Sequence, residues 1–453
     1  MDHAPDILNH SIPRLLRAIA VPAGTGFFFN TMFNVVDTLY GGRISTQALA
    51  ALSLSFPVFF LIIAMAAGIS SGATALIGHA LGGKRTDEAR LYAAQTLSFA
   101  IVNGLFLTVA GWTAAPLLFR FMGASGDYLA MAVHYIRVIF LGATCFIVNH
   151  QFNAMLSSRG DTRSFRNFLI AAFFLNLVLD PWLLYGGLGV PALGLSGIGL
   201  GTVLIHGCGV FYMGYRARST GLLEGFTLQS LVPRARPYRE LARQSFPSAL
   251  NMLTVAIGIF IITGFITRFG QDAVAAYGIA TRIEQIVLLP VMGLNVATLS
   301  LVAQNSGARN YRRVRETVTT ALVAGVSLMS IGSVLVFSLA DPLMRLFTGD
   351  GAVVAVGEGY LHFAAFIFAA YVILYINVSA LQGLRRPLFA LGLGLFRQIA
   401  APAVAFYLLA YALGMGLTGI WWGILGVTWC AAVISLAFTR WLVRGLAGEA
   451  AGA

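Results

Sequence analysis

Charged side chains are scarce in this chain, since only 10% of the residues are Asp, Glu, Lys or Arg while 58% are hydrophobic. A water-soluble protein of this length needs a charged exterior, and so little charge cannot cover one. Apolar runs of the length that a membrane span requires, roughly 20 residues, recur along the whole chain. The scarcity of charge therefore excludes a soluble globular protein and indicates an integral membrane protein.

Cysteine is also rare, and Cys145, Cys208 and Cys430 each lie inside an apolar run. Such scattered thiols form neither a disulfide framework nor a metal cluster. A membrane-embedded enzyme would need a cluster of catalytic side chains, whereas His79 and His206 are isolated. The polar start and the long first apolar run argue against a cleavable signal peptide. We therefore expect a protein that is not an enzyme, has no cofactor and retains its first helix.

Twelve candidate spans follow from the apolar runs. They cover about residues 15–41, 47–78, 91–118, 128–156, 167–186, 193–215, 245–267, 273–304, 317–340, 359–382, 388–411 and 417–443. With the N-terminus inside the cell, most of the 29 basic residues fall in cytoplasmic segments. The positive-inside rule predicts this distribution for an even number of helices with both termini in the cytoplasm. The net charge of +12 thus reflects topology, and we predict no nucleic-acid partner.

The chain consists of two related halves with six predicted spans each. When the sequence is shifted by a constant number of residues, the first part of the first half aligns with the first part of the second half without a gap. The matched pairs include Pro22 with Pro247, Arg43 with Arg268 and Gly68 with Gly293. A polar connection rich in arginine, with Pro233 and Pro237, separates the halves. We predict an N-terminal lobe (1–215), a cytoplasmic linker (216–243) and a C-terminal lobe (244–453), the parallel repeat that is typical of some transporters.

Acidic residues are almost absent from the predicted spans. The three that lie deep in them are Asp37, Asp180 and Glu284. An ionised side chain in the bilayer interior costs at least about 3 kcal/mol, so it faces a cavity or a partner. These three residues are therefore the best functional candidates in the chain.

Asp37 and Asp180 are predicted to lie at similar depth in the first half. By helical spacing, Asn30 and Asn34 share a face with Asp37, and Asn176 shares a face with Asp180. Two such carboxyl groups could share a proton or donate oxygen atoms to a hard cation. The alternative is two unrelated structural residues, each satisfied by its neighbours.

The second half carries a different charged group. Ile262 occupies the position equivalent to Asp37, so the ionic chemistry belongs mainly to the first half. Glu284 in the eighth span has Arg282 close by in sequence and Arg397 in the eleventh span. We favour a buried ion pair that holds helices together, and a charge that contacts substrate is the alternative.

Several segments carry a resemblance to a known family. They are the first span with Pro22 and Asp37, the NLVLDP motif, and the loops GHALGGKRTDEAR (78–90) and AQNSGARNYRRVRE (303–316). Over essentially the whole chain, this set resembles the multidrug and toxic compound extrusion (MATE) family. The resemblance implies an all-α membrane protein of twelve helices in a V-shaped pair of six-helix bundles. It also implies export of cationic or amphipathic compounds in exchange for H+ or Na+.

The resemblance assigns roles to individual residues. Asp37 resembles the family's first-helix aspartate, and Asn176 and Asp180 resemble its fifth-helix pair. Thr202 resembles the sixth-helix threonine that completes the polar cluster, so these four residues are expected to bind the coupling ion, H+ or Na+. The NorM-like branch has acids in its seventh and tenth helices, whereas this chain has Asn251 and other uncharged residues there. In this respect the chain resembles the DinF-like and archaeal members of the family, that is, the DinF-like prokaryotic branch, and a sodium site in the second half is not implied.

We predict an ion-coupled antiporter that exports organic cations or amphipathic drugs across the cell (inner) membrane. Pro22 is expected to bend the first helix during transport. The residues expected to line a substrate cavity or to gate it are Pro22, Asn34, Asn153, Arg282, Glu284 and Arg397. The expected partners are small organic substrates and membrane lipid, and the protein is expected to be a monomer. A lipid-linked precursor flippase is the main alternative, but it would need a strongly basic cavity; a non-transporting membrane scaffold is the other.

Overall fold

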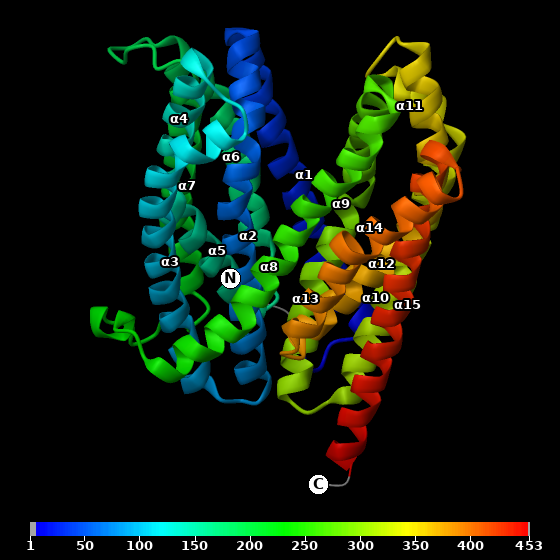
Figure 1. The fold of residues 1–453 in the computed structure, drawn as a ribbon. Coiled ribbons are helices and arrows are strands. Elements are labelled where there is room, and N and C mark those ends of the chain that lie inside the picture. Colours follow the sequence, from blue (N-terminus) through cyan, green and yellow to red (C-terminus); the bar gives the residue numbers. More distant parts are fainter. Residues whose placement is uncertain (1–5, 452–453) are drawn as a thin grey trace. The chain divides into compact units, whose positions relative to one another are not determined.

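The computed structural model describes residues 6–451, which are almost entirely helical (Figure 1). The first half contains α1 (Ile12–Ile44), α2 (Thr46–Gly82), α3 (Thr86–Phe121), α4 (Gly126–Leu141), α5 (Ala143–Ser158), α6 (Arg163–Tyr185) and α7 (Leu195–Arg218). The second half follows the 3-10 helix η1 (Leu228–Leu231) and contains α8 (Ala235–Ile266), η2 (Thr267–Phe269), α9 (Gln271–Gly307), α10 (Tyr311–Ser338), α11 (Ala340–Arg345), α12 (Gly351–Gly383), α13 (Pro387–Leu395), η3 (Phe396–Ala400), α14 (Ala401–Phe406), η4 (Tyr407–Ala412) and α15 (Gly416–Ala451). Residues 1–5 and 452–453 lie outside the described residues. The prediction that both termini are cytoplasmic refers in part to these residues.

The predicted all-α membrane fold is confirmed. Among the described residues, eleven helical spans are long and apolar enough to cross a membrane, and a bent pair brings the total to twelve. The bent pair is α4 and α5, which meet at 44°, so the span predicted at 128–156 is not one straight helix. The break falls at Gly142, where a Cβ atom would lie 2.5 Å from the side chain of Val203. Close passage of α7 at this point explains the requirement for glycine.

The span predicted at 388–411 is also interrupted. Between α13 and α14 the backbone widens into the π-helical segment η3, and a second π-helical segment, η4, follows α14. Such segments are rare and occur frequently at functional sites. Apolar periodicity gives no signal for them, because the residues remain apolar and helical throughout.

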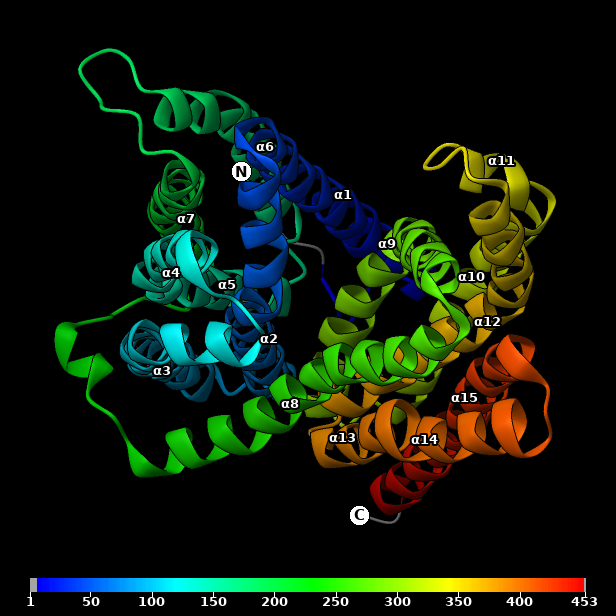
Figure 2. The same ribbon diagram turned by 45° about the horizontal axis from the view of Figure 1, so that its top comes forward.

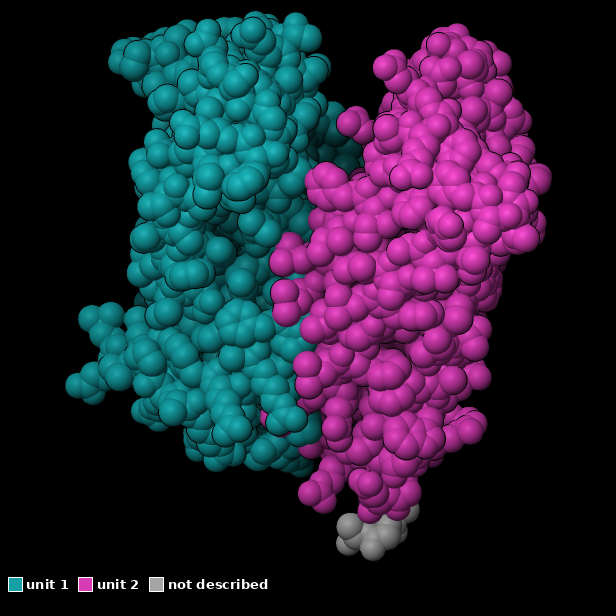
Figure 3. All heavy atoms as spheres, in the orientation of Figure 1, with its two compact units in different colours: residues 1–5, 25–249 teal, residues 6–24, 250–453 magenta. Residues whose placement is uncertain are grey.

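The described chain forms two compact units, which Figure 3 distinguishes by colour. The first unit contains residues 25–249, and the second contains residues 6–24 and 250–453. The first part of α1 therefore belongs to the second unit, and the first part of α8 belongs to the first unit. The predicted lobes instead place all of α1 in the first half, and the predicted second lobe begins at residue 244, inside α8. The shift that aligns Pro22 with Pro247 also relates the two switch points, after Gly24 and after Ala249.

Two glycines at equivalent positions of the repeat explain why the start of α8 packs in the first unit and the start of α1 packs in the second unit. In the first unit, a Cβ atom on Gly68 would lie 2.5 Å from atoms of Ala249. In the second unit, a Cβ atom on Gly293 would lie 2.2 Å from the carbonyl oxygen of Ala20 and 2.8 Å from the nitrogen of Gly24. Glycine thus permits the backbones to touch, as small residues do between membrane helices. The match of Gly68 with Gly293 in the repeat therefore has a packing cause.

An arginine anchors the chain's N-terminal segment to the second unit. The Nη2 atom of Arg313 donates to the carbonyl oxygens of Ile7 at 3.0 Å and His10 at 2.7 Å. Its Nε atom donates to Asn305 Oδ1 at 3.1 Å. These charge-assisted bonds hold residues 6–11 against α9 and α10.

The connection between the halves is shorter and more ordered than the predicted linker. Helix α8 begins at Ala235, inside the range 216–243, because a proline such as Pro237 is tolerated in the first turn of a helix. The side chain of Gln95 on α3 donates to the carbonyl oxygens of Ser230 and Val232, each at 2.9 Å. Its oxygen accepts a hydrogen bond from the backbone nitrogen of Arg234 at 2.8 Å. The connection is therefore bound to the first unit along α3.

Each unit has its own core. In the first unit α5 packs against α2, α3 and α7, and α6 packs against α7 (Figure 2). In the second unit α12 packs against α9, α10 and α15. Tyr360 and Phe368 of α12 are completely or almost completely buried there. These central helices position the polar groups described below.

Candidate functional site

Two helices of the first unit bring the predicted acidic pair together. Asp37 lies on α1, and Asn176 and Asp180 lie one turn apart on α6. The Nδ2 atom of Asn176 donates a hydrogen bond to Asp37 Oδ1 at 2.9 Å. Asp37 is 9% exposed, while Asn176 and Asp180 are fully buried. The structure thus joins residues that are far apart in the sequence into one buried cluster.

The cluster contains more hydrogen-bond acceptors than donors. The carboxyl groups of Asp37 and Asp180 are close enough to interact electrostatically. Both oxygens of Asp180 and the amide oxygen of Asn176 have no hydrogen-bond donor among the described residues. Buried acceptors are normally satisfied, and each orphaned one requires an explanation. A proton shared between the carboxyl groups, or a cation bound by these oxygens, would satisfy them.

Helix α7 closes one side of the cluster with a glycine that sequence reasoning missed. A Cβ atom on Gly201 would lie 3.0 Å from Asp180 Oδ1, so the backbone of α7 lies directly against the carboxyl group. The neighbouring Thr202 is 3% exposed. Its hydroxyl group donates to the carbonyl oxygen of Ile198 in its own helix at 3.0 Å.

Tyr135 on α4 is a second residue that the sequence did not indicate. It is buried and lies within electrostatic reach of both Asp37 and Asp180. No motif or spacing marked this residue, because its place depends on the packing of α4 against α7.

The oxygen atoms of the cluster are of the kind that can hold a proton or a hard cation. Oxygen atoms from carboxyl and amide groups are the ligands that hard cations prefer. No group of three or more His, Cys, Asp or Glu residues suited to a metal ion occurs in the described part of the chain. Any cation at Asp37 and Asp180 would therefore also need the orphaned amide oxygen of Asn176.

Three other predicted residues do not join this cluster. Asn34 is exposed, and its amide donates to the carbonyl oxygen of Asn30 in its own helix at 2.8 Å. Asn153 on α5 is half-buried and accepts a hydrogen bond from the hydroxyl of Ser157 at 3.2 Å. Pro22 is buried in α1, in the part of this helix that belongs to the second unit.

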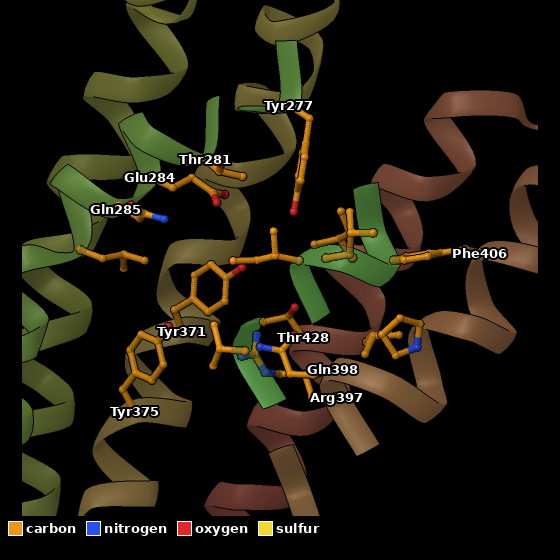
Figure 4. Close-up of a pocket in the computed structure, with 17 residues that line it drawn as sticks. Tyr277, Thr281, Glu284, Gln285, Tyr371, Tyr375, Arg397, Gln398, Phe406 and Thr428 are labelled. Carbon is orange, nitrogen blue, oxygen red and sulfur yellow. The ribbon is translucent and has the colours of Figure 1, made fainter. Parts of the chain in front are cut away.

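The second unit contains its own charged cavity (Figure 4). Its volume is about 120 Å³, and Glu284 and Arg397 both line it. Glu284 Oε1 accepts a hydrogen bond from the hydroxyl of Tyr360 at 3.0 Å. Arg282 is exposed and does not line the cavity.

The expected direct ion pair of Glu284 is absent from the described residues. Arg397 interacts with Glu284 electrostatically but does not approach to within ion-pair distance. Its guanidinium carbon lies instead 5.5 Å from the ring centre of Tyr371. The expected ion pair is thus not formed, and one carboxylate oxygen of Glu284 accepts a hydrogen bond from Tyr360 on the adjacent α12 instead. Arg282 is not the partner either, because it is exposed and lies outside the cavity.

Comparison with known proteins gives a consistent result. Two segments, residues 22–182 and 247–408, match the family model described as MatE and together cover more than half of the chain. The segments begin at positions 22 and 247, the same pair that the sequence repeat aligns, which confirms the internal repeat. Sequence reasoning and the family model thus divide the chain in the same register.

Individual relatives match over most of their length. A probable multidrug resistance protein NorM of Thermotoga maritima is 26% identical over 350 residues, which are 77% of this chain and 75% of that protein. An FAD transporter of Shewanella oneidensis is 27% identical over 394 residues, 87% of each chain. A solved outward-facing multidrug resistance MATE transporter has a TM-score of 0.91 at 24% identity, covering 98% of this chain and 99% of that one.

Proposed function

Since this chain belongs to the MatE family of membrane transporters, we propose that it is an ion-coupled antiporter of the cell membrane. Organic cations or amphipathic drugs leave the cell in exchange for H+ or Na+. The observation that carries this proposal is the buried cluster of Asp37, Asn176 and Asp180, in which three oxygen acceptors lack a donor. Buried acidic groups within a membrane span are expensive and are typically functional.

The cluster supports coupling through its charge. Without a bound ion, two neighbouring carboxylates repel each other in a medium of low dielectric constant. A proton or Na+ removes this repulsion and fills the empty acceptor positions of Asp180 and Asn176. The resulting free-energy difference between loaded and empty states is what an exchange cycle needs in order to bias one conformation. Thr202 assists the same site when its hydroxyl turns away from its own helix.

Helix α1 would transmit the change at the cluster. Asp37 lies on this helix, and Pro22 lies nearer its N-terminal end, in the part that belongs to the second unit. A proline removes one backbone hydrogen bond and is a common site of helix bending. Neutralisation of Asp37 would therefore permit α1 to bend near Pro22 and to release the substrate.

The flippase alternative needs a strongly basic cavity. Three arginines, Arg137, Arg282 and Arg397, lie inside the predicted spans, and of these only Arg397 lines the cavity of the second unit. Arg282 is exposed, and Arg137 lies against the ring of Trp112 at 5.1 Å. This distribution favours the antiporter.

The test is efflux from proteoliposomes under an imposed proton gradient and, separately, an imposed sodium gradient. Ethidium serves as the fluorescent organic cation. FAD serves as a second substrate, because one relative is named as its transporter. The variants are Asp37→Asn and Asp180→Asn, which keep the shape of the side chains. Asp127→Asn is the matched control, because Asp127 is an exposed aspartate of the same unit.

We expect one gradient to drive efflux by the wild-type protein and by Asp127→Asn, and neither gradient to drive efflux above background by the two cluster variants. The gradient that works identifies the coupling ion. Efflux by correctly folded Asp37→Asn and Asp180→Asn at the wild-type rate would refute the proposed coupling site. Efflux of neither compound under either gradient would refute the antiporter.

A further inference from the structure

The cavity of the second unit has a construction that the ion-coupling cluster of the first unit does not explain. Five elements form its walls: α8, α9, α12, α15 and the interrupted span that contains η3 and α14. Figure 4 shows Glu284 and Gln285 of α9, Tyr371 of α12, and Arg397 and Gln398 of η3 around it. All of these residues belong to the second unit.

One pole of the cavity is negative. Glu284 is only 6% exposed, yet its side chain lines the cavity. Tyr360 donates to one carboxylate oxygen at 3.0 Å, and no cation lies within ion-pair distance among the described residues. A buried carboxylate without a cation in direct contact is costly. It is therefore a strong acceptor for an ammonium group that enters the cavity.

The other pole is positive. Arg397 lies on the π-helical segment η3, together with Gln398, which also lines the cavity. The guanidinium group lies over the ring of Tyr371 at 5.5 Å, which fixes it by a cation–π contact. In Figure 4 the ring of Tyr371 lies between Glu284 and Arg397, so the two charges occupy different levels of the cavity. Guanidinium groups match carboxylates in shape and hydrogen-bonding geometry.

Four aromatic side chains, together with several aliphatic ones, line the cavity. Tyr371 and Tyr375 stack with their ring centres 5.9 Å apart and their planes 10° apart. Tyr277 and Phe406 also line the cavity. Its volume of about 120 Å³ is close to the roughly 150 Å³ that holds a benzene molecule in an engineered protein cavity. The space thus has room for little more than one six-membered ring.

We propose that this cavity binds a one-ring aromatic zwitterion, with an ammonium group at Glu284 and a carboxylate group at Arg397 and Gln398. A structural ion pair would bring the two charged side chains into contact, whereas here they face the same space and remain apart. A pure cation site would not place an arginine in the wall. A pure anion site would not place a buried glutamate there. The proposal concerns binding and does not rest on ion coupling at Asp37 and Asp180.

Three compounds of nearly equal size separate the possible ligands. The zwitterion is 4-(aminomethyl)benzoate, the cation is 4-methylbenzylamine and the anion is 4-methylbenzoate. Radiolabelled 4-(aminomethyl)benzoate is measured by equilibrium dialysis against the full chain in lipid nanodiscs, and the other two compounds serve as competitors. The comparison within the wild-type protein needs no mutation, so a folding defect cannot affect it.

Two variants and one control then assign the poles. Glu284→Gln and Arg397→Gln each remove one charge and keep a hydrogen-bonding side chain. Arg282→Gln is the control, since Arg282 is exposed on the same helix as Glu284 and does not line the cavity. Size-exclusion chromatography checks that each variant is folded and monodisperse.

We expect the wild type to bind the zwitterion about tenfold more tightly than either singly charged compound, because each charge-assisted hydrogen bond contributes a factor of that order or more. In Glu284→Gln the zwitterion should no longer bind more tightly than 4-methylbenzoate. In Arg397→Gln it should no longer bind more tightly than 4-methylbenzylamine. Arg282→Gln should keep both differences in affinity. Tighter binding of the cation or of the anion would overturn the proposal. Absence of binding, or equal loss in all three variants, would also overturn it.

Discussion

Replacement of Gly293 by alanine tests the packing that joins the start of α1 to the second unit. A Cβ atom at this position would lie 2.2 Å from the carbonyl oxygen of Ala20 and 2.8 Å from the nitrogen of Gly24. Both neighbours are backbone atoms, so no side-chain rotation can relieve the clash. A carbon-to-oxygen contact normally measures about 3.3 Å or more. The first part of α1 must therefore move by about 1 Å to restore a normal contact.

The magnitude follows from two opposing terms. Overpacking of a tightly packed site costs about 1–3 kcal/mol, while alanine in place of glycine inside a helix contributes about 0.5–1 kcal/mol of stability. The difference is a destabilisation of up to about 2.5 kcal/mol, centred on about 1 kcal/mol. A unit of this size loses about 2–4 °C in melting temperature per kcal/mol, so we expect a decrease of several degrees.

The assay is thermal unfolding of the purified protein in one detergent, followed by tryptophan fluorescence. Gly278→Ala is the control, because Gly278 lies on the same helix and its Cβ atom would meet nothing within 4 Å. Gly68→Ala tests the equivalent contact with Ala249 in the first unit. We expect both Gly293→Ala and Gly68→Ala to melt below Gly278→Ala. If Gly293→Ala melts at or above the temperature of Gly278→Ala, the close contact does not stabilise the fold and the reasoning fails.

Two further predictions concern single contacts. Gly201→Ala places a Cβ atom 3.0 Å from Asp180 Oδ1, so it should slow ion-driven efflux with little change in melting temperature. The control Gly207→Ala, whose Cβ atom meets nothing within 4 Å, should leave efflux unchanged. Equal efflux by both variants would contradict the proposed role of Asp180. Arg313→Gln removes hydrogen bonds to two N-terminal carbonyl oxygens and one amide oxygen. Backbone hydrogen exchange of residues 6–11 should therefore accelerate by about tenfold or more. Arg312→Gln is the control, because Arg312 is exposed, and it should not change this exchange rate.

The membrane character, the number of spans and the repeat are properties of the sequence itself. Lipid has no hydrogen-bonding partners for the backbone, so each span must be a long apolar helix, which composition reveals directly. Asp37, Asp180 and Glu284 could also be identified from the sequence, because a charged side chain inside a membrane span is costly. The register of the repeat was visible because matched glycines and prolines serve the same backbone geometry in both halves. Asn176 was found because it lies one helical turn from Asp180.

Only the tertiary structure decided which groups meet. The hydrogen bond from Asn176 to Asp37 joins two helices whose rotation about their axes is set by packing, which a nearly uniform apolar sequence does not specify. The same holds for Gly201 beside Asp180, and for Tyr360, which donates a hydrogen bond to Glu284 where an arginine had been expected. The division of α1 and α8 between the units likewise depends on contacts between segments distant in sequence. Periodicity shows which residues lie on one face of a helix, but packing determines what that face contacts.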